Sequence, residues 1–169
     1  MIRVLAVLTA LIAVGLCGGT ALASGAAAGD APGVGFVKPV PHAWISQGFG
    51  CTSFAFEPVD RACPGGHWHS GIDLAAARGT PVRATLPGLV IIIVSATGYG
   101  LHVVIDHGGG LSSLYGHLDT VLVTSVEFVV AGQVIGTVGS SGNATGPHLH
   151  FEIRRDGIAE DPHLDLALP

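Results

Sequence analysis

Two histidines stand one residue apart in the segment His148-Leu149-His150, which leads into the pattern Phe151-Glu152-Ile153. This pattern predicts a strand, and in a strand residues i and i+2 point to the same face. Both imidazoles are therefore expected on one face, with Leu149 turned into the core. Two neutral imidazoles at this spacing suit a divalent metal, or one metal ligand beside one catalytic group. The polar face of an exposed strand is the alternative interpretation.

A second pair of candidate ligands is formed by His69 and Asp73, four residues apart. In an extended segment positions i and i+4 share a face, so both side chains can point to one side. Gly71 between them leaves space for a close backbone approach or for a ligand. A surface turn explains the same spacing, so the pair alone is weak evidence of a site. His117, beside a glycine at the end of a predicted strand, is placed to reach a cleft.

Together these residues point to a zinc hydrolase. Catalytic zinc typically takes three protein ligands with N and O donors and leaves one position to water. Such zinc lowers the pKa of the bound water to about 7 and polarises the scissile carbonyl. The sequence offers His69, Asp73 and one residue of the pair His148 and His150 as ligands. The remaining histidines, His117 among them, are then available to handle protons and the oxyanion.

Two other metal motifs are weighed against this site. The sequence contains no His-Glu-x-x-His motif, so a helix-borne metalloprotease site is excluded. The segment His67-Trp68-His69 also has the spacing of a metal-binding pair. It lacks the following Asp-His of metallo-β-lactamase-type sites, so we interpret His67 as a residue at the rim of the site.

The elements that must position these residues are predicted to be short strands. Apolar, β-branched runs bounded by Gly, Pro, Asn or Ser predict strands, at residues 89–94, 101–105, 111–115, 121–123, 127–130, 134–138 and 148–153. Beyond residue 23, no stretch keeps a 3.6-residue periodicity without a Gly or Pro nearby. We therefore expect a mainly β fold, an antiparallel β-sheet domain.

The first 23 residues have the features of a removable export signal. Arg3 is followed by an apolar run at residues 4–16, and Ala21-Leu22-Ala23 gives a small-x-small cleavage site. The apolar run is shorter than the about 20 residues that a membrane-spanning helix needs. An uncleaved membrane anchor is the alternative interpretation of this segment. Residues 24–35 are small and unpatterned, which predicts a flexible leader. The folded domain is expected over residues 36–169.

Charge and cysteine usage limit the partners and the compartment. The chain has 12 Asp and Glu against 7 Lys and Arg and no basic run, which argues against nucleic acid and anionic lipid. We expect no stable membrane insertion after signal cleavage. Cys51 and Cys63 are the two cysteines after the signal. An even number of cysteines in an exported chain predicts a disulfide. Two free buried thiols are the alternative.

At this point the motifs resemble, together and in order, those of the lysostaphin-type, LytM-like zinc endopeptidases, which cleave peptidoglycan. They are HSGIDL (69–74), GTPV (79–82), YGHL (115–118) and GNATGPHLHFE (142–152), with SQGFG (46–50) and AGQVIGTVGSSG (131–142) beside them. The resemblance extends over residues 36–162, nearly all of the chain after the leader. It is specific because the motifs occur together with matching separations.

The resemblance implies roles for the individual residues. His69, Asp73 and His150 are expected to bind one Zn²⁺ per chain. His117 and His148 are expected to form an unliganded catalytic pair, in which one takes a proton from the zinc-bound water and the other stabilises the tetrahedral intermediate. The resemblance also implies an antiparallel sheet with a groove on one face. The segment from residue 51 to residue 63 would then form one wall of that groove.

The function implied by the resemblance is hydrolysis of peptide bonds in bacterial peptidoglycan by a zinc-activated water. We expect a secreted, periplasmic or cell-wall-associated monomer that acts on stem or cross-bridge peptides. The alternative is a non-catalytic wall-binding or amidase-activating module, although such relatives usually have a broken ligand set. Glycine bridges and D-alanine-containing stem peptides are both open as targets, as are remodelling of the cell's own wall and attack on other cells. Also open are which histidine is the base and whether the leader masks the groove.

Overall fold

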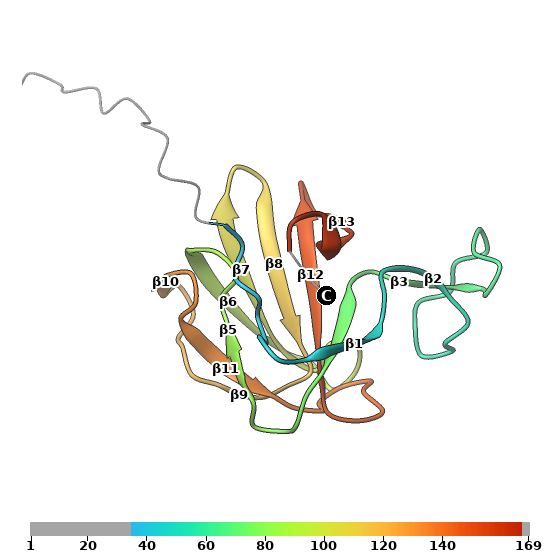
Figure 1. Cartoon of the computed structure of the whole chain (residues 1–169), viewed down its shortest axis with the longest axis horizontal. Helices are drawn as coiled ribbons and strands as arrows, with labels where there is room; N and C mark the ends of the chain where they lie inside the picture. Colours follow the sequence, from blue (N-terminus) through green and yellow to red (C-terminus); the bar gives the residue numbers. More distant parts are fainter. Residues whose placement is uncertain (1–34, 167–169) are drawn as a thin grey trace, which may run out of the picture. The chain divides into compact units, whose positions relative to one another are not determined.

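Two antiparallel β-sheets and a small hairpin make up the fold in the computed structural model, which describes residues 35–166 (Figure 1). All of these residues belong to one compact unit, Gly33–Pro169. The predicted export signal and all but the last residue of the predicted leader lie outside the described residues. Within residues 35–166, no helix is long and apolar enough to cross a membrane.

The larger sheet has eight strands in the order β1-β4-β12-β8-β7-β6-β10, with β13 paired to β12. Their bounds are β1 Trp44–Gln47, β4 Ile72–Ala75, β6 Gly88–Val94, β7 Leu101–Gly108, β8 Leu111–Gly116, β10 Phe128–Val129, β12 His148–Arg155 and β13 Ile158–Glu160. All of the paired strands are antiparallel. The prediction of a mainly β fold is therefore confirmed.

The remaining elements form two smaller sheets and one helical turn. The three-stranded sheet has the order β5-β11-β9, and β2 pairs with β3. Their bounds are β2 Gly50–Thr52, β3 His67–His69, β5 Pro81–Arg83, β9 Leu118–Val121 and β11 Val134–Val138, followed by the 3₁₀ turn Pro162–Leu164. A disulfide joins Cys51 to Cys63 and closes the segment between β2 and β3. The predicted disulfide is thus present.

Alternation along the strands divides the larger sheet into an apolar face and a polar face. Leu149, Phe151 and Ile153 of β12 are fully buried in the core, which also contains Val82 of β5 and Ile135 of β11. The residues that alternate with them along the strand, His148, His150 and Glu152, share the opposite face. A slip of β12 by one residue would move the histidines into the core. Burial of each apolar side chain, about 1.5–3 kcal/mol, therefore also fixes where the histidines point.

Most of the strands expected from the sequence are present, with different ends. The prediction of 134–138 matches β11, and those of 89–94, 101–105, 111–115 and 148–153 lie within β6, β7, β8 and β12. The prediction of 121–123 is wrong, because the strand there is Leu118–Val121. This strand begins directly after a turn at His117. Its residues Thr120 and Val121 pair with β11. The predicted strand 127–130 is shorter, at Phe128–Val129.

Gly71 lets the chain between β3 and β4 pass directly against β12. A Cβ atom at this position would lie 2.3 Å from the carbonyl oxygen of Phe151 and 2.9 Å from Cγ of Glu152. The expectation that Gly71 permits a close backbone approach is therefore confirmed. The glycine lies between His69 and Asp73, so the approach also sets how near these two residues come to β12.

We predict that Gly71→Ala lowers the free energy of unfolding by about 1–3 kcal/mol, the usual cost of overpacking. Urea denaturation of the metal-free protein measures it. Gly146→Ala is the matched control, because a Cβ atom at Gly146 meets nothing within 4 Å. Equal stability of the two variants would show that the approach at Gly71 has no energetic importance.

Candidate metal centre

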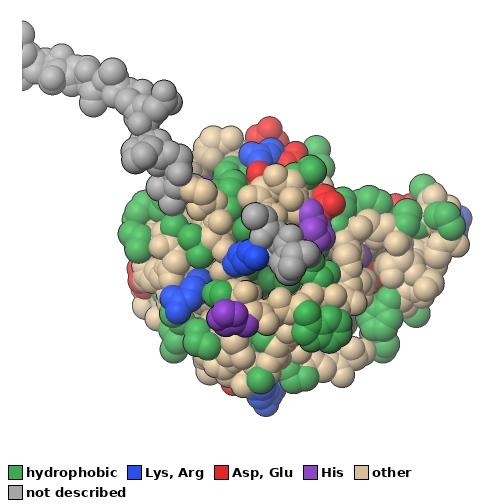
Figure 2. Space-filling model, viewed as in Figure 1, with side chains coloured by type: hydrophobic (Ala, Val, Ile, Leu, Met, Phe, Trp, Pro, Cys, Tyr) green, Lys and Arg blue, Asp and Glu red, His purple; other side chains and the backbone are tan. Residues whose placement is uncertain are grey.

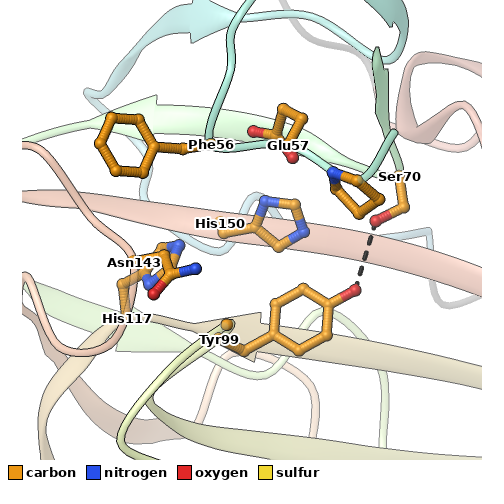
Figure 3. Close-up of a pocket in the computed structure, with 9 residues that line it drawn as sticks. Phe56, Glu57, Ser70, Tyr99, His117, Asn143 and His150 are labelled. Carbon is orange, nitrogen blue, oxygen red and sulfur yellow. Dashed lines mark hydrogen bonds between the residues drawn. The ribbon is translucent and has the colours of Figure 1, made fainter. Parts of the chain in front are cut away.

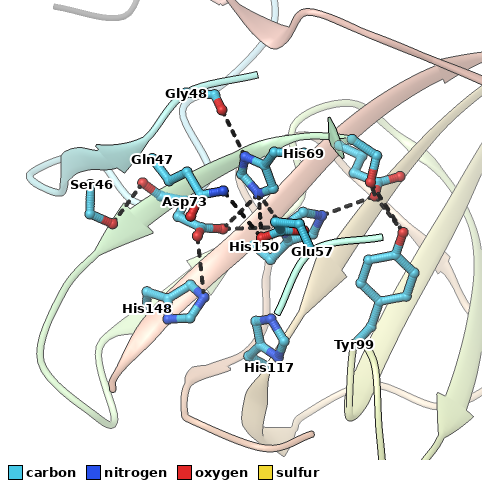
Figure 4. A network of polar contacts seen from close by, with 12 residues as sticks. Ser46, Gln47, Gly48, Glu57, His69, Asp73, Tyr99, His117, His148 and His150 are labelled. Atoms are coloured by element: carbon cyan, nitrogen blue, oxygen red, sulfur yellow. Dashed lines mark hydrogen bonds and ion pairs between the residues drawn. The ribbon is translucent and has the colours of Figure 1, made fainter. Parts of the chain in front are cut away.

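Three possible ligand atoms, carried by three different strands, meet on the polar face of the larger sheet. His69 Nε2 lies 3.2 Å from Asp73 Oδ1. His150 Nδ1 lies 3.0 Å from His69 Nε2 and 3.1 Å from Asp73 Oδ1 (Figure 4). All three residues are buried. His150 and Asp73 stand directly opposite each other in the pairing of β12 with β4, so the sheet register brings them together.

Hydrogen bonds on the outer side of each imidazole fix which nitrogen faces the cluster. His69 Nδ1 donates to the carbonyl oxygen of Gly48 at 2.8 Å, which leaves a lone pair on Nε2. His150 Nε2 donates to Glu152 Oε1 at 2.9 Å, so Nδ1 of the neutral ring carries the inner lone pair. Two lone pairs and the carboxylate oxygen of Asp73 then face one another. Such an arrangement requires a proton or a cation between the three atoms.

The donor set fits zinc. Two imidazole nitrogens and one carboxylate oxygen form a three-ligand set of the kind found in catalytic zinc sites. Ligands about 2.0–2.2 Å from one tetrahedral ion lie about 3.3–3.6 Å apart, close to the 3.0–3.2 Å separations observed. Within residues 35–166, His69, Asp73 and His150 are the one group of His, Cys, Asp or Glu side chains found close enough to share an ion.

His117 and His148 lie beside the cluster without joining it. Their ring centroids are 4.7 Å apart, and His148 Nε2 lies 3.7 Å from Asp73 Oδ2. Nδ1 of His117 donates to the carbonyl oxygen of Ser141 at 2.7 Å, and Nδ1 of His148 donates to that of Gly146 at 2.8 Å. In both rings Nε2 is therefore the nitrogen left free to exchange a proton.

His117 is held in an unusual conformation at the junction of β8 and β9. Its φ is 59°, in the left-handed region that non-glycine residues seldom occupy. Its backbone N–H donates to the carbonyl oxygen of Tyr99 at 2.8 Å, and its ring is held by Ser141. Burial lowers the pKa of His117 to about 4, against the opposing effect of the Ser141 carbonyl. The imidazole is therefore neutral at pH 7. Strain of this kind concentrates at functional sites.

A buried carboxylate holds His150 from behind. Glu152 Oε1 accepts hydrogen bonds from His150 Nε2 at 2.9 Å, from Ser70 Oγ at 2.6 Å and from Tyr99 OH at 2.7 Å. Its other oxygen accepts from Arg154 Nε. Burial raises the pKa of Glu152, but the hydrogen bonds and charges of His150 and Arg154 lower it to about 2. A carboxylate in this position orients a histidine ligand and makes it more basic.

The cluster lies in a groove with two hollows, of about 380 Å³ and about 300 Å³. The first is lined by Tyr99, Ser70, Phe56 and His150, and the second by Ser46, Phe54, Asp73 and His148. Glu57, His117 and Asn143 line both. Figure 3 shows Phe56 and Glu57 on one side of His150 and Tyr99 on the other. The disulfide-closed segment therefore forms one wall, as the resemblance implied, and hydrophobic side chains gather on it (Figure 2).

Four of the five residues singled out from the sequence line this groove, and the fifth, His69, is fully buried beside His150. His67 stays outside the cluster, where its Nδ1 donates to the carbonyl oxygen of Glu57 at 2.7 Å. The sequence analysis missed the roles of Glu152, Tyr99 and Glu57. Glu152 follows His150 by two residues, so strand parity could have placed it on the same face. Tyr99 and Glu57 come from loops, and no local pattern indicates where their side chains point.

Comparison with known proteins identifies the family. A model described as Peptidase family M23 matches residues 67–162. This chain belongs to peptidase family M23. The match covers more than half of the chain and includes the three residues of the cluster and both neighbouring histidines, which confirms the resemblance drawn from the motifs.

Among curated relatives, the chain is 39% identical over 135 residues to the DD-carboxypeptidase/endopeptidase Mpg of Neisseria meningitidis, covering 79% of this chain and 29% of Mpg. It is 48% identical over 92 residues to the murein hydrolase activator EnvC of Escherichia coli, covering 54% of this chain and 22% of EnvC. The chain thus spans less than a third of either relative.

Solved structures agree with the family assignment. A zinc-containing peptidase from Vibrio cholerae superposes with a TM-score of 0.65 at 31% identity, over 80% of this chain and 41% of that one. The catalytic domain of lysostaphin from Staphylococcus simulans gives a TM-score of 0.59 at 31% identity, over 72% and 90%.

We predict that zinc binding at pH 7 releases about one proton. Burial lowers the pKa of His150, but hydrogen bonds and charges of Asp73 and Glu152 raise it to about 9 in the metal-free protein. His150 is then protonated at pH 7 and must lose this proton to bind zinc. Affinity should rise about tenfold per pH unit up to about pH 9 and level off above it. Calorimetry in two buffers of different ionisation enthalpy counts the protons, and a count of zero would contradict this account.

We also predict that Glu152→Gln weakens zinc binding by about 10- to 100-fold. Glutamine keeps an acceptor for His150 but removes the negative charge that makes the ring basic. A competition titration with a zinc chelator measures the affinity. Glu160→Gln on β13 is the control, since it makes the same change of charge outside both hollows. Equal affinities for the two variants would exclude a positioning role of Glu152.

Proposed function

We propose that this protein is a zinc-dependent endopeptidase that hydrolyses peptide bonds of bacterial peptidoglycan. In this proposal His69, Asp73 and His150 hold one Zn²⁺, and His117 and His148 form the catalytic pair. The observation that supports it most directly is the complete three-donor cluster in a groove with two further imidazoles beside it. Family M23 membership and relatives named as endopeptidases support the same reaction.

The chemistry divides between the ion and the chain. Bound zinc would lower the pKa of a water molecule and polarise the scissile carbonyl. The groove residues bind and orient the peptide, and the rings of His117 and His148 each offer Nε2 to the reacting groups. One ring takes the proton of the attacking water. The other ring, in its protonated form, stabilises the oxyanion. The Nδ1 hydrogen bonds to Ser141 and Gly146 keep both rings in the required orientation.

The proposal includes a location outside the cytoplasm. The relative named as a murein hydrolase activator and the Cys51–Cys63 disulfide both suit an extracytoplasmic compartment. Residues 1–23 would serve as the export signal, residues 24–35 as a leader, and residues 36–169 as the peptidase domain. The protein would act as a monomer on stem or cross-bridge peptides.

A murein hydrolase activator without activity of its own is the second candidate, favoured by the 48% identity to EnvC. An activator needs no metal and no proton-transfer groups. Here the donor atoms His69 Nε2, Asp73 Oδ1 and His150 Nδ1 are all present, and Glu152 and Gly48 orient the two rings. This arrangement supports catalysis over activation alone.

We predict that three histidine variants separate the two candidates. His150→Ala should lose zinc and activity together, whereas His117→Ala and His148→Ala should retain zinc and lose activity by about 100-fold or more. Purified peptidoglycan is digested, the soluble fragments are analysed by mass spectrometry, and zinc is measured per chain. Full activity in His150→Ala would rule out zinc-dependent hydrolysis. A wild-type protein that only stimulates an added murein hydrolase would favour the activator.

A further inference from the structure

We propose that the domain contains an acid-sensitive latch between its two sheets, which is closed while His107 is neutral and opens when this ring takes up a proton. The latch consists of Thr85, Pro87, His107, Ser113 and Tyr115. It lies apart from the candidate metal centre, so the inference depends neither on a bound metal ion nor on the proposed endopeptidase function.

A chain of hydrogen bonds leaves the connection between β5 and β6 at Thr85 and returns to it at Pro87. The backbone N–H of Thr85 donates to Tyr115 OH at 2.8 Å. Tyr115 OH lies 2.9 Å from Ser113 Oγ, which lies 2.8 Å from His107 Nε2. His107 Nδ1 then donates to the carbonyl oxygen of Pro87 at 2.8 Å. Since β5 belongs to the smaller sheet and β6 to the larger one, the chain ties their connection to β7 and β8.

The latch is buried on the core face of the larger sheet. Ser113 and Tyr115 stand opposite Ile153 and Phe151 in the pairing of β8 with β12, and all four side chains are fully buried. His107 is half-buried. The candidate metal centre lies on the opposite face of the sheet, so proton uptake by the latch is a separate event from metal binding.

The His107 ring has no ion-pair partner among the described residues. The connection offers it the carbonyl of Pro87, and β8 offers the hydroxyl of Ser113 with the phenol of Tyr115 behind it. Burial raises the pKa of Tyr115, so the phenol stays neutral. On β7 the charged neighbour is Asp106, whose Oδ1 accepts at 2.8 Å from the backbone N–H two residues further on. A protonated ring would therefore be a cation held by neutral groups, which is costly away from water.

The order of the protons along the latch depends on the state of His107. The Thr85 N–H can only donate, so with a neutral ring Tyr115 donates to Ser113 and Ser113 donates to His107 Nε2, which satisfies every member. A protonated ring donates at Nε2 and turns the Ser113 hydroxyl towards Tyr115. The phenol oxygen then faces two donors, and its own proton has no acceptor in the latch. Thr85 Oγ1 forms no hydrogen bond and so offers none. A buried donor without an acceptor destabilises the closed latch.

The direction of the pH effect follows from the same burial. Burial lowers the pKa of His107 below its ordinary value of 6.5, against the opposing effects of the Pro87 carbonyl and of Asp106. As the pH falls, the unfolded chain therefore takes up this proton before the folded chain does. The stability that the neutral ring contributes is complete above pH 6.5 and is lost as the pH falls from 6.5 through the pKa of the folded state.

A direct titration of the ring by NMR is the first test. In the zinc-loaded protein with ¹⁵N-labelled histidine, His107 should carry its proton on Nδ1 at neutral pH and should titrate below the ordinary histidine pKa of about 6.5. A His107 that titrates at or above this value would overturn the latch, because the folded state would then accept the proton at no cost.

The second test compares urea unfolding of the zinc-loaded wild type and His107→Gln at several pH values. Between about pH 7.5 and about pH 5, the unfolding equilibrium constant of the wild type should rise about 3- to 30-fold more than that of the variant, because glutamine takes up no proton. Protonation of the metal ligands contributes equally to both proteins and cancels. His42→Gln, a change at an exposed histidine, is the matched control and should follow the wild type.

Parallel pH dependence of the wild type and His107→Gln would overturn the latch, and so would an equal loss of pH dependence in His42→Gln. If His107→Gln does not fold at neutral pH, the NMR titration of the wild type decides the question alone. A low pKa of His107 together with the larger pH dependence of the wild type would support the latch.

Discussion

The antiparallel pairing of β12 with β4 is the constraint on which the site depends. It places His150 opposite Asp73, and the close pass at Gly71 then brings His69 to the same point. The apolar residues that alternate with the histidines along β12 are buried in the core, so the packing energy of the domain fixes the direction of the histidine side chains. The candidate metal site is in this sense a consequence of the sheet register.

Each polar group of the site is oriented by a partner outside it. Gly48, Glu152, Ser141 and Gly146 each hold one histidine through the nitrogen that points away from the groove, and Glu152 is itself held by Tyr99. Buried polar groups without such partners would cost stability. The same contacts leave every inner nitrogen with a lone pair for a metal ion or a proton. One network thus satisfies the buried polar groups and also meets the requirement of the proposed catalysis.

The limits of prediction from sequence follow from the same geometry. Parity along one strand was enough to place His148 and His150 on one face, and it would have placed Glu152 there as well. The strand at 121–123 was misplaced because apolar character does not reveal a turn with positive φ at His117. The contacts of Tyr99 and Glu57 depend on loops that meet strands distant in sequence, and no local pattern carries that information. The choice between His148 and His150 as the ligand came from the family resemblance, and the contact between His150 Nδ1 and His69 Nε2 agrees with it.

The central claim is that one zinc ion is held by His69 Nε2, Asp73 Oδ1 and His150 Nδ1. Diffraction from zinc-loaded crystals on both sides of the zinc absorption edge tests it most directly. The account predicts one anomalous peak per chain, about 2.0–2.2 Å from each of these three atoms, with His117 and His148 outside bonding distance. A peak bound to His148, or no peak at this cluster under zinc-replete conditions, would contradict it.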